Sequence, residues 1–243
     1  PPANAEESVA KSIVTIDGKR FDKEKTELIY EHISKQQILK TAEAKFIRLD
    51  IKTNNERIAY IMGAGDQVPQ SLQQMGYTVT IVKPEKITSS LLETFDAVVV
   101  GIRAYNVVEA LQFKQPLLFE YVRNGGTMVV QYNTTGSLIT QDIAPYPLEI
   151  SSDRVTEENA TVTFLDPKHK VLNFPNKITA DDFKGWVQER GAYFPAQWDE
   201  AYEPLFEMHD TGEEPLQGST LYAKYGKGNF IYTPLAFFRQ LPA

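Results

Sequence analysis

The chain of 243 residues contains no cysteine. This absence excludes a disulfide framework, a zinc site built on thiolates, an iron–sulfur cluster and any mechanism with a cysteine nucleophile. Histidine is scarce as well, because His32, His169 and His209 are the only three and none has the spacing typical of zinc ligands. We therefore expect no catalytic residue, no metal site and no cofactor in this region.

Basic residues are also fewer than acidic ones. Lys and Arg number 25 against 32 Asp and Glu, which gives a net charge of −7 and a pI near 5.1. No basic cluster exceeds two residues, so we expect no nucleic-acid partner. The longest apolar run, Ala97 to Ile102, is far shorter than a membrane helix, and we expect no membrane insertion. The chain begins at Pro1 without a methionine, so we interpret it as part of a longer protein.

From Arg57 onward, apolar strand patterns alternate with helical ones. Glycine and turn residues punctuate them, with Gly76 placed as a helix C-terminal cap. Such repeats predict an α/β fold with a doubly wound parallel sheet of the flavodoxin-like kind. The expected strands are 57–62, 77–82, 95–100 and 127–132, and the expected helices cover 68–75, 89–93 and 117–122. Later we expect a strand at 161–165, a capping box at 179–182 and a hairpin of 221–225 with 228–233.

The first 54 residues form a separate β-rich segment in this interpretation. The stretches 12–16, 27–33 and 45–51 have the apolar–polar alternation of half-buried strands, and Asp17-Gly18 is a hairpin turn signal. We expect this N-terminal β extension to be the tail of a preceding domain or to pack on the main domain, 55–243.

A dinucleotide-binding turn is the first alternative for Gly63-Ala64-Gly65, with Glu85 about twenty residues further on. Val68 occupies the third glycine position, however, and Asp66 would repel a pyrophosphate. We expect Asp66 to be the N-cap of the following helix instead.

A ligand site is expected where the parallel strands end, because doubly wound sheets bind ligands at their carboxyl edge. Three loops, 63–66, 101–106 and 131–134, should meet there. Arg103 offers a bidentate fork for a carboxylate, and the other polar side chains are candidates for hydrogen bonds to hydroxyl groups. The candidates for ligand binding or domain docking in these loops are Asp66, Arg103, Tyr105, Asn106, Gln131 and Asn133.

The segment 185–191 adds Trp186, Glu189 and Arg190 to the candidates. An equally weighted interpretation has Arg103 paired with Glu189 or Asp66, so that an ion pair fastens the loops together. A tryptophan in such a loop, as at Trp186, more often anchors the loop to the core than stacks against a sugar ring.

The order of elements, with FDAVVVGIRAYN and NGGTMVVQYNT, resembles the class I glutamine amidotransferase-like fold in its ThuA-like branch. The stretch DPKHKVLNFPNKITADDFKGWVQERGAYFP is similar to a ThuA-type region, although Lys170 stands where a proline is expected. The blocks IMGAGDQVPQSL, GIRAYN, GWVQERGAYFP and YTPLAFFRQLPA more closely resemble the C-terminal region of large bacterial PIG-L (LmbE-like) deacetylases of the Bacteroidetes type.

The resemblance implies a non-catalytic accessory domain of a zinc-dependent carbohydrate N-deacetylase. The zinc would belong to an upstream deacetylase domain of the same polypeptide, and export to the periplasm or cell surface is implied. The domain would bind a glycan or dock on the catalytic domain. An amidotransferase cysteine would sit after the strand 128–132, where this chain has Gln131, Tyr132 and Asn133, so glutamine hydrolysis is excluded.

Two alternatives stay open. One is a ThuA-like enzyme of sugar metabolism in which Glu189, with Asp66 or His169, acts as acid and base. The other is a structural spacer, whose polar loops at the strand edge would satisfy one another.

Overall fold

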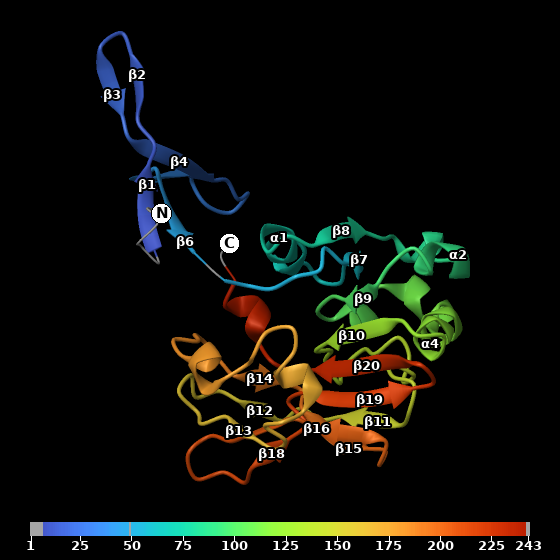
Figure 1. Ribbon diagram of the computed structural model, residues 1–243. Helices are drawn as coiled ribbons and strands as arrows, with labels where there is room; N and C mark the ends of the chain where they lie inside the picture. The colour runs from blue at the N-terminus through green and yellow to red at the C-terminus, as the bar shows by residue number, and fades with distance from the viewer. Residues whose placement is uncertain (1–6, 49, 242–243) are drawn as a thin grey trace. The chain divides into compact units, whose positions relative to one another are not determined.

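The computed structural model describes residues 7–48 and 50–241 (Figure 1). They fall into two compact units that divide between Ile51 and Lys52. Among these residues no helix combines the length and the apolar composition that crossing a bilayer requires.

The first unit consists of antiparallel strand pairs. These are β1 (Glu7–Lys11) with β6 (Glu43–Ile47), β2 (Val14–Ile16) with β3 (Lys19–Phe21), and β4 (Lys23–Leu28) with β5 (Gln36–Thr41). The predicted turn at Asp17-Gly18 joins β2 to β3, and both residues have positive φ, as a hairpin turn of this length requires. The expectation of a strand at 27–33 is wrong beyond Leu28, where β4 ends. The expected strand 45–51 ends at Ile47, and Leu49 lies outside the described residues.

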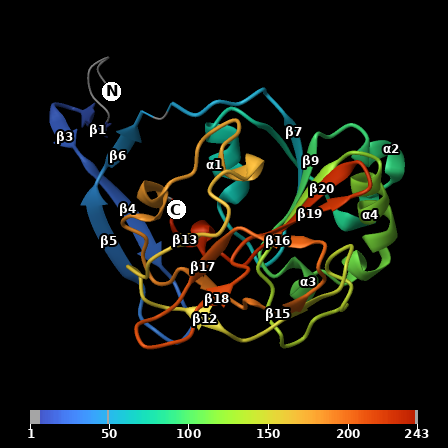
Figure 2. The same ribbon diagram turned by 60° about the horizontal axis from the view of Figure 1, so that its bottom comes forward.

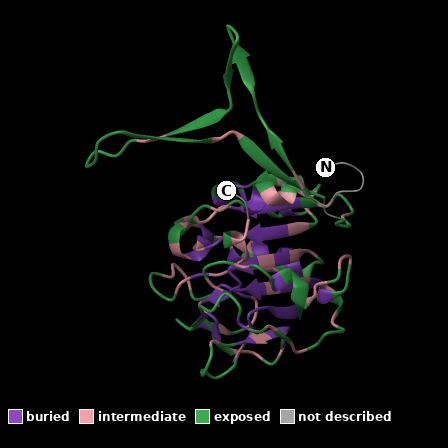
Figure 3. Cartoon of the chain, turned by 90° about the vertical axis from the view of Figure 1, so that its left-hand side faces the viewer, coloured by how far each residue is buried: buried purple, intermediate pink, exposed green. Residues whose placement is uncertain are grey.

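The apolar side chains of this unit are mostly exposed, among them Val9, Ile16 and Phe21. Figure 3 shows its ribbons almost wholly in the colour of exposed residues. The half-buried face expected from the alternation is therefore not formed. A two-stranded ribbon has no second layer to cover either face, so alternation alone cannot bury it.

A seven-stranded sheet forms the centre of the second unit, in the order β16-β19-β20-β10-β9-β7-β8. Its strands are β7 (Arg57–Ile61), β8 (Thr78–Ile81), β9 (Ala97–Val100), β10 (Thr127–Gln131), β16 (Tyr202–Pro204), β19 (Leu221–Tyr225) and β20 (Gly228–Thr233).

The sheet is mixed, which corrects the expectation of a wholly parallel one. The strands β8, β7, β9, β10 and β20 are parallel neighbours, whereas β19 and β16 continue the sheet antiparallel. A short hairpin from β19 to β20 causes the change, because two tightly joined strands must run in opposite directions. The parallel strands, counted along the chain, have the order 2-1-3-4-5 of doubly wound sheets with a switch point between the first and third strands.

Helices cover both faces of the sheet, as Figure 2 shows with α1 on one side and α2 and α4 on the other. Helix α1 (Val68–Gln74) packs with Tyr60 and Val99. The opposite face is covered by α2 (Ser89–Leu92) and α4 (Gln115–Arg123), together with η1 (Pro84–Lys86), α3 (Ala104–Val107) and η2 (Glu109–Phe113). Gly76, with φ 102°, ends α1 as predicted.

Beyond β10 the chain forms short strands and 3-10 turns around a separate apolar cluster that includes Phe183, Phe194 and Phe206. The expected strand 161–165 is reduced to two residues, and the predicted capping box of Thr179 and Asp182 begins a 3-10 turn. The elements are β11 (Leu148–Ile150), β12 (Arg154–Val155), β13 (Thr163–Phe164), β14 (Gly191–Ala192), β15 (Pro195–Trp198), β17 (Phe206–Met208), β18 (Leu216–Gln217), η3 (Lys170–Leu172), η4 (Ala180–Phe183) and η5 (Phe237–Arg239).

The turns that follow β7 and β9 approach each other very closely. A Cβ atom on Gly63 would clash with the backbone carbonyl of Ile102 and with the backbone of Ala104. The amide of Ala64 donates a 2.9 Å hydrogen bond to that same carbonyl. Only glycine at position 63 allows the two turns to meet in this way.

We predict that Gly63→Ala lowers the free energy of unfolding by about 1–3 kcal/mol, because the added methyl group meets backbone that cannot move aside. Chemical denaturation measures the change. Gly136→Ala is the matched control, since a Cβ there meets nothing within 4 Å. The control should stay within about 0.5 kcal/mol of the wild type. Equal stability of the two variants would contradict the proposed constraint.

Candidate functional site

The carboxyl edge of the parallel strands brings the three expected loops together. Ala64, after β7, donates to Ile102, after β9, and the amide of Arg103 donates a 2.8 Å hydrogen bond to the carbonyl of Tyr132, after β10. This edge includes the switch point between β7 and β9, where ligands bind in doubly wound sheets. It is therefore the candidate site.

Arg103 stands at the apex of a strained turn between β9 and α3. Its φ of 54° and ψ of 22° place it in the left-handed region, which is uncommon for a residue with a side chain. A residue in a sharp, strained strand-to-helix turn is the arrangement by which α/β hydrolases present their nucleophile. In an amidotransferase the corresponding turn would follow the strand 128–132. Here the loop after that strand has one left-handed residue that is not glycine, Ser137, with a φ of 60°.

A hydrogen-bonded chain lies behind the turn, against the sheet. Gln131 Nε2 donates 2.8 Å to the Tyr60 hydroxyl, and that hydroxyl lies 2.8 Å from both carboxylate oxygens of Asp66. Burial, together with the charge of Asp66, raises the pKa of the Tyr60 phenol above its ordinary value, so Tyr60 stays a donor.

Asp66 serves the start of α1, although not in the role expected. The N-cap residue is Gln67, one position later, and it makes no side-chain capping bond. Asp66 Oδ1 instead accepts a 2.9 Å hydrogen bond from the amide of Val68, at the first helical position. The carboxylate thus satisfies one free amide of the first turn from outside the helix.

Asn133 and Asn106 hold the loops of the edge in place. Asn133 is fully buried, accepts a hydrogen bond from the amide of Tyr105 and donates one to the carbonyl of Gln131. Asn106 donates to the carbonyls of Thr134 and Gly136 and accepts from the amide of Thr134. Both amides are therefore engaged in positioning backbone.

Tyr105 belongs to the core rather than to the surface of the edge. Its ring is fully buried in the main apolar cluster, and burial raises the pKa of its phenol. Its hydroxyl has no hydrogen-bond partner among the described residues. The structure thus places this residue apart from the solvent-facing part of the site.

Three aromatic rings form a row beside Arg103. The ring of Tyr132 stacks on Tyr193 at 5.9 Å and on Phe238 at 5.2 Å, with interplanar angles of 12° and 16°. Guanidinium groups cover the row at both ends: Arg154 lies 5.7 Å from the ring of Tyr193, and Arg239 lies 5.2 Å from that of Phe238. We call this stack the aromatic row.

Charges of both signs surround Tyr132. Burial, the largest influence, raises the pKa of its phenol, whereas Arg239 and Arg103 lower that pKa and Glu189 raises it. Arg239 Nε lies 2.9 Å from Glu189 Oε1, so those two charges offset each other. No ion pair joins Arg103 to any described residue, and its Nε is buried without a hydrogen-bond partner.

Backbone strain is concentrated around the same ring. Gln188 has φ 71° and Tyr193 has φ 63°, and with Arg103 they make three left-handed residues that are not glycine. Gln188 Oε1 accepts a hydrogen bond from Arg239, while Tyr193 stacks on Tyr132. Such strain persists where the surrounding structure enforces it, and it tends to gather at functional sites.

Trp186 packs against the second apolar cluster, and Arg190 lies over the rings of Phe183 and Trp186. The buried Arg190 donates to the backbone carbonyls of Ala160 and Phe183, and its guanidinium lies 5.7 Å from the ring of Trp186. Burial lowers the pKa of Arg190. Trp186 Nε1 donates to the carbonyl of Asp182. Both side chains stabilise the loop 180–190 from within.

The expected acid–base residues do not all meet. Glu189, whose side chain is 12% exposed, lies near Tyr132 as Arg103 does. His169 instead packs against Tyr222, whose hydroxyl bonds to Asn229 at the beginning of β20. His169 therefore lies toward the opposite edge of the sheet. No cluster of three possible metal ligands occurs among the residues that the structure describes.

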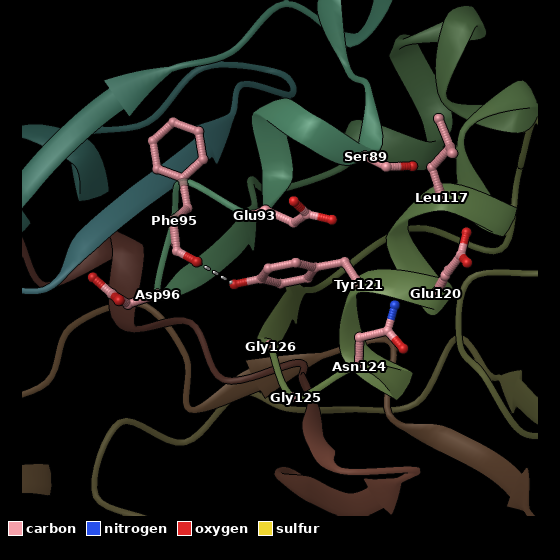
Figure 4. A pocket seen from close by; sticks show the side chains of 10 residues that line it. All are labelled: Ser89, Glu93, Phe95, Asp96, Leu117, Glu120, Tyr121, Asn124, Gly125 and Gly126. Carbon is pink, nitrogen blue, oxygen red and sulfur yellow. Dashed lines mark hydrogen bonds between the residues drawn. The ribbon is translucent and has the colours of Figure 1, made fainter.

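Two of the pockets have no lining residue from the loops 63–66, 101–106 and 131–134. One, of about 380 Å³, is at the amino edge between α2 and α4, and Figure 4 shows Glu93, Asp96 and Glu120 around it. The Tyr121 hydroxyl on its wall donates to the carbonyl of Phe95. A second pocket, of about 280 Å³, is almost wholly apolar and includes Trp186 and Phe237 in its lining.

Several residues of the site were missed from sequence. Tyr60 was assigned only to a strand, and Tyr193, Phe238, Arg154 and Arg239 were not considered as neighbours of Tyr132. The one available signal was Phe237-Phe238-Arg239, an aromatic–arginine sequence near the end of the chain. Nothing local indicates which ring such a segment will contact.

No protein-family model and no curated protein sequence matches this chain. Among solved structures, a cytoplasmic protein from Salmonella typhimurium is 10% identical, with a TM-score of 0.47, over 94% of this chain and 84% of its own. A GMP synthase-type protein from Thermoplasma acidophilum is 13% identical, with a TM-score of 0.47, over 77% and 90%. A ThuA-like protein from Bacteroides uniformis is 11% identical, with a TM-score of 0.44, over 77% and 86%. Likenesses this distant carry no argument for a function.

We predict that Asn133→Ala lowers the free energy of unfolding by about 1–3 kcal/mol, because it leaves the amide of Tyr105 buried without a partner. Thermal and chemical unfolding measure the loss. Asn124→Ala, an exposed asparagine just after α4, is the control and should change stability by less than about 0.5 kcal/mol. A harmless Asn133→Ala would show that the edge does not depend on this side chain.

Proposed function

We propose that residues 52–243 form an amidotransferase-like α/β domain that has no hydrolytic chemistry of its own and binds a glycan, or docks on a catalytic domain, at its carboxyl edge. The observation that carries this proposal is the strained turn after β9, which presents Arg103. A guanidinium stays protonated at any physiological pH, so it cannot attack a carbonyl group, but it can hold an anion or a polar partner.

The neighbouring polar side chains support a binding role. Gln131, Asn133 and Asn106 are engaged in hydrogen bonds that fix the loops, which gives the edge a rigid, preorganised backbone. Hydrogen bonds among these groups are also what a structural spacer would show, although Gln131 Oε1 is buried without a hydrogen-bond partner among the described residues. Arg103 favours binding over the spacer, because its guanidinium has no ion-pair partner among the described residues.

The association with a deacetylase rests on the sequence blocks that resemble the C-terminal region of PIG-L (LmbE-like) proteins of the Bacteroidetes type. In this proposal a zinc-dependent N-deacetylase domain lies upstream in the same polypeptide and carries out the reaction. The amidotransferase-like domain positions that enzyme on its carbohydrate or stabilises it. Export to the periplasm or cell surface is part of the same proposal.

A second candidate function, a ThuA-like sugar enzyme, has one observation in its favour. Glu189 and Arg103 both lie near Tyr132, so an acid and a cation share one neighbourhood. Against it, Arg239 already pairs with the Glu189 carboxylate, and Asp66 is held by Tyr60 and by the amide of Val68. We therefore give it second place.

We predict that the purified chain releases neither ammonia from glutamine nor acetate from N-acetylglucosamine oligomers, with or without added zinc, above the rate of a protein-free blank. Coupled assays for ammonia and acetate measure both reactions. Release of either product would overturn the non-catalytic assignment. Loss of such activity in Glu189→Gln, with retention in Glu93→Gln at the opposite edge, would favour the second candidate.

We also predict that the reading frame upstream of Pro1 encodes a deacetylase domain with the His-Pro-Asp-Asp zinc motif of that family. Sequencing of the gene in its source genome tests this directly. An upstream region without such a domain would remove the deacetylase from the proposal and leave the binding role of the carboxyl edge to be judged separately.

A further inference from the structure

Arg103 is an unusual residue to find at a strained turn. The left-handed backbone costs about 1–2 kcal/mol for a residue with a side chain, and glycine would avoid that cost. The turn is enforced from both sides, by the hydrogen bond of the Arg103 amide to Tyr132 and by the close approach of Gly63 to Ala104. The fold therefore holds this guanidinium in one place rather than leaving it on a mobile loop.

The charge of Arg103 is uncompensated where it stands. Of the cations around the aromatic row, Arg239 pairs with Glu189, and Arg154 is exposed at the far side of Tyr193, where solvent screens its charge. Arg103 is half-buried, and its Nε has neither solvent nor a protein partner among the described residues. A guanidinium N–H that is shielded from water and has no acceptor is unfavourable, so the site favours an added hydrogen-bond acceptor, and an anion suits the charge.

The surroundings also specify what kind of anion is suitable. One uncompensated guanidinium matches a single negative charge, and its planar fork matches the geometry of a carboxylate. The half-buried Tyr132 and Tyr193 have hydroxyls without a hydrogen-bond partner among the described residues, so these remain available to the hydroxyl groups of a ligand. The Tyr132 ring already stacks with Tyr193 and with Phe238, so we expect a ligand to meet its hydroxyl rather than to stack on it.

We infer that the carboxyl edge binds a sugar acid, with Arg103 holding the carboxylate and the aromatic row supplying hydroxyl groups beside it. This inference rests on the proposed glycan-binding function and narrows the ligand to a carbohydrate that carries a carboxylate. Three strained residues are linked to the aromatic row: Arg103 lies near Tyr132, Tyr193 stacks on it, and Gln188 accepts a hydrogen bond from Arg239. Their convergence is what a preorganised binding site requires.

The test is titration calorimetry of the whole chain with D-glucuronate, D-glucose and inorganic phosphate at low ionic strength. We expect glucuronate to bind at least tenfold more tightly than glucose and than phosphate. Arg103→Gly should weaken glucuronate binding at least tenfold while its Tm stays within about 3 °C of the wild type, because glycine adopts the same backbone. Arg103→Lys keeps the positive charge but not the planar guanidinium, so its affinity for glucuronate should lie between those of the wild type and Arg103→Gly.

Arg57→Ala is the matched control. Arg57 is the first residue of β7, on the opposite edge of the sheet, and it pairs there with Asp96. It should bind glucuronate as the wild type does. Equal affinity for glucuronate and glucose, with no effect of Arg103→Gly, would overturn the sugar-acid inference and leave glycan binding standing. Tighter binding of phosphate than of glucuronate would also overturn the sugar-acid inference. So would the absence of a binding signal from every probe at concentrations up to about 10 mM, because a dissociation constant above that value corresponds to less than about 3 kcal/mol of binding free energy.

Discussion

The close approach of the turns after β7 and β9 is the constraint on which the rest of the site depends. Gly63 leaves room for the backbone of Ile102 and Ala104, and the hydrogen bond from Ala64 closes the contact. With the two turns locked together, the chain can enter α3 only through a sharp turn. Arg103 occupies the apex of that turn in a left-handed conformation. A glycine after one strand thus fixes the position of an arginine after the next.

The polar groups at the strand ends divide into two sets with different roles. The buried amides of Gln131 and Asn133 and the half-buried amide of Asn106 form hydrogen bonds with backbone and with Tyr60, which makes the edge rigid. The half-buried groups around the aromatic row differ: the hydroxyls of Tyr132 and Tyr193 have no hydrogen-bond partner, and the guanidinium of Arg103 has no ion-pair partner among the described residues. In α/β hydrolases a strained strand-to-helix turn presents a nucleophile. Here the strained turn after β9 presents the guanidinium of Arg103, which is a hydrogen-bond donor and not a nucleophile.

The local charge at the edge differs from that of the whole chain. The net charge of −7 would repel an anion at long range, but salt screens exposed charges beyond about 8 Å at physiological ionic strength. The groups nearest Tyr132 therefore decide what approaches it. Those are two guanidiniums and one carboxylate, an excess of one positive charge.

The sequence alone determined six of the seven strands of the sheet, all except β16, and several of their ends. Apolar runs predicted β7, β8, β9 and β10, Gly76 predicted the end of α1, and the glycines between β19 and β20 predicted their hairpin. These features depend only on neighbouring residues and on periodicity. It also excluded cysteine chemistry outright, since a missing atom type cannot be supplied by folding. Only the tertiary structure decided that the sheet is mixed, that Arg103 stands in a strained turn after β9, and that Tyr105 is in the core. It alone brought Phe238 and Arg239 to Tyr132 across more than a hundred residues. Those outcomes depend on which distant side chains share a space, and no local pattern carries that information.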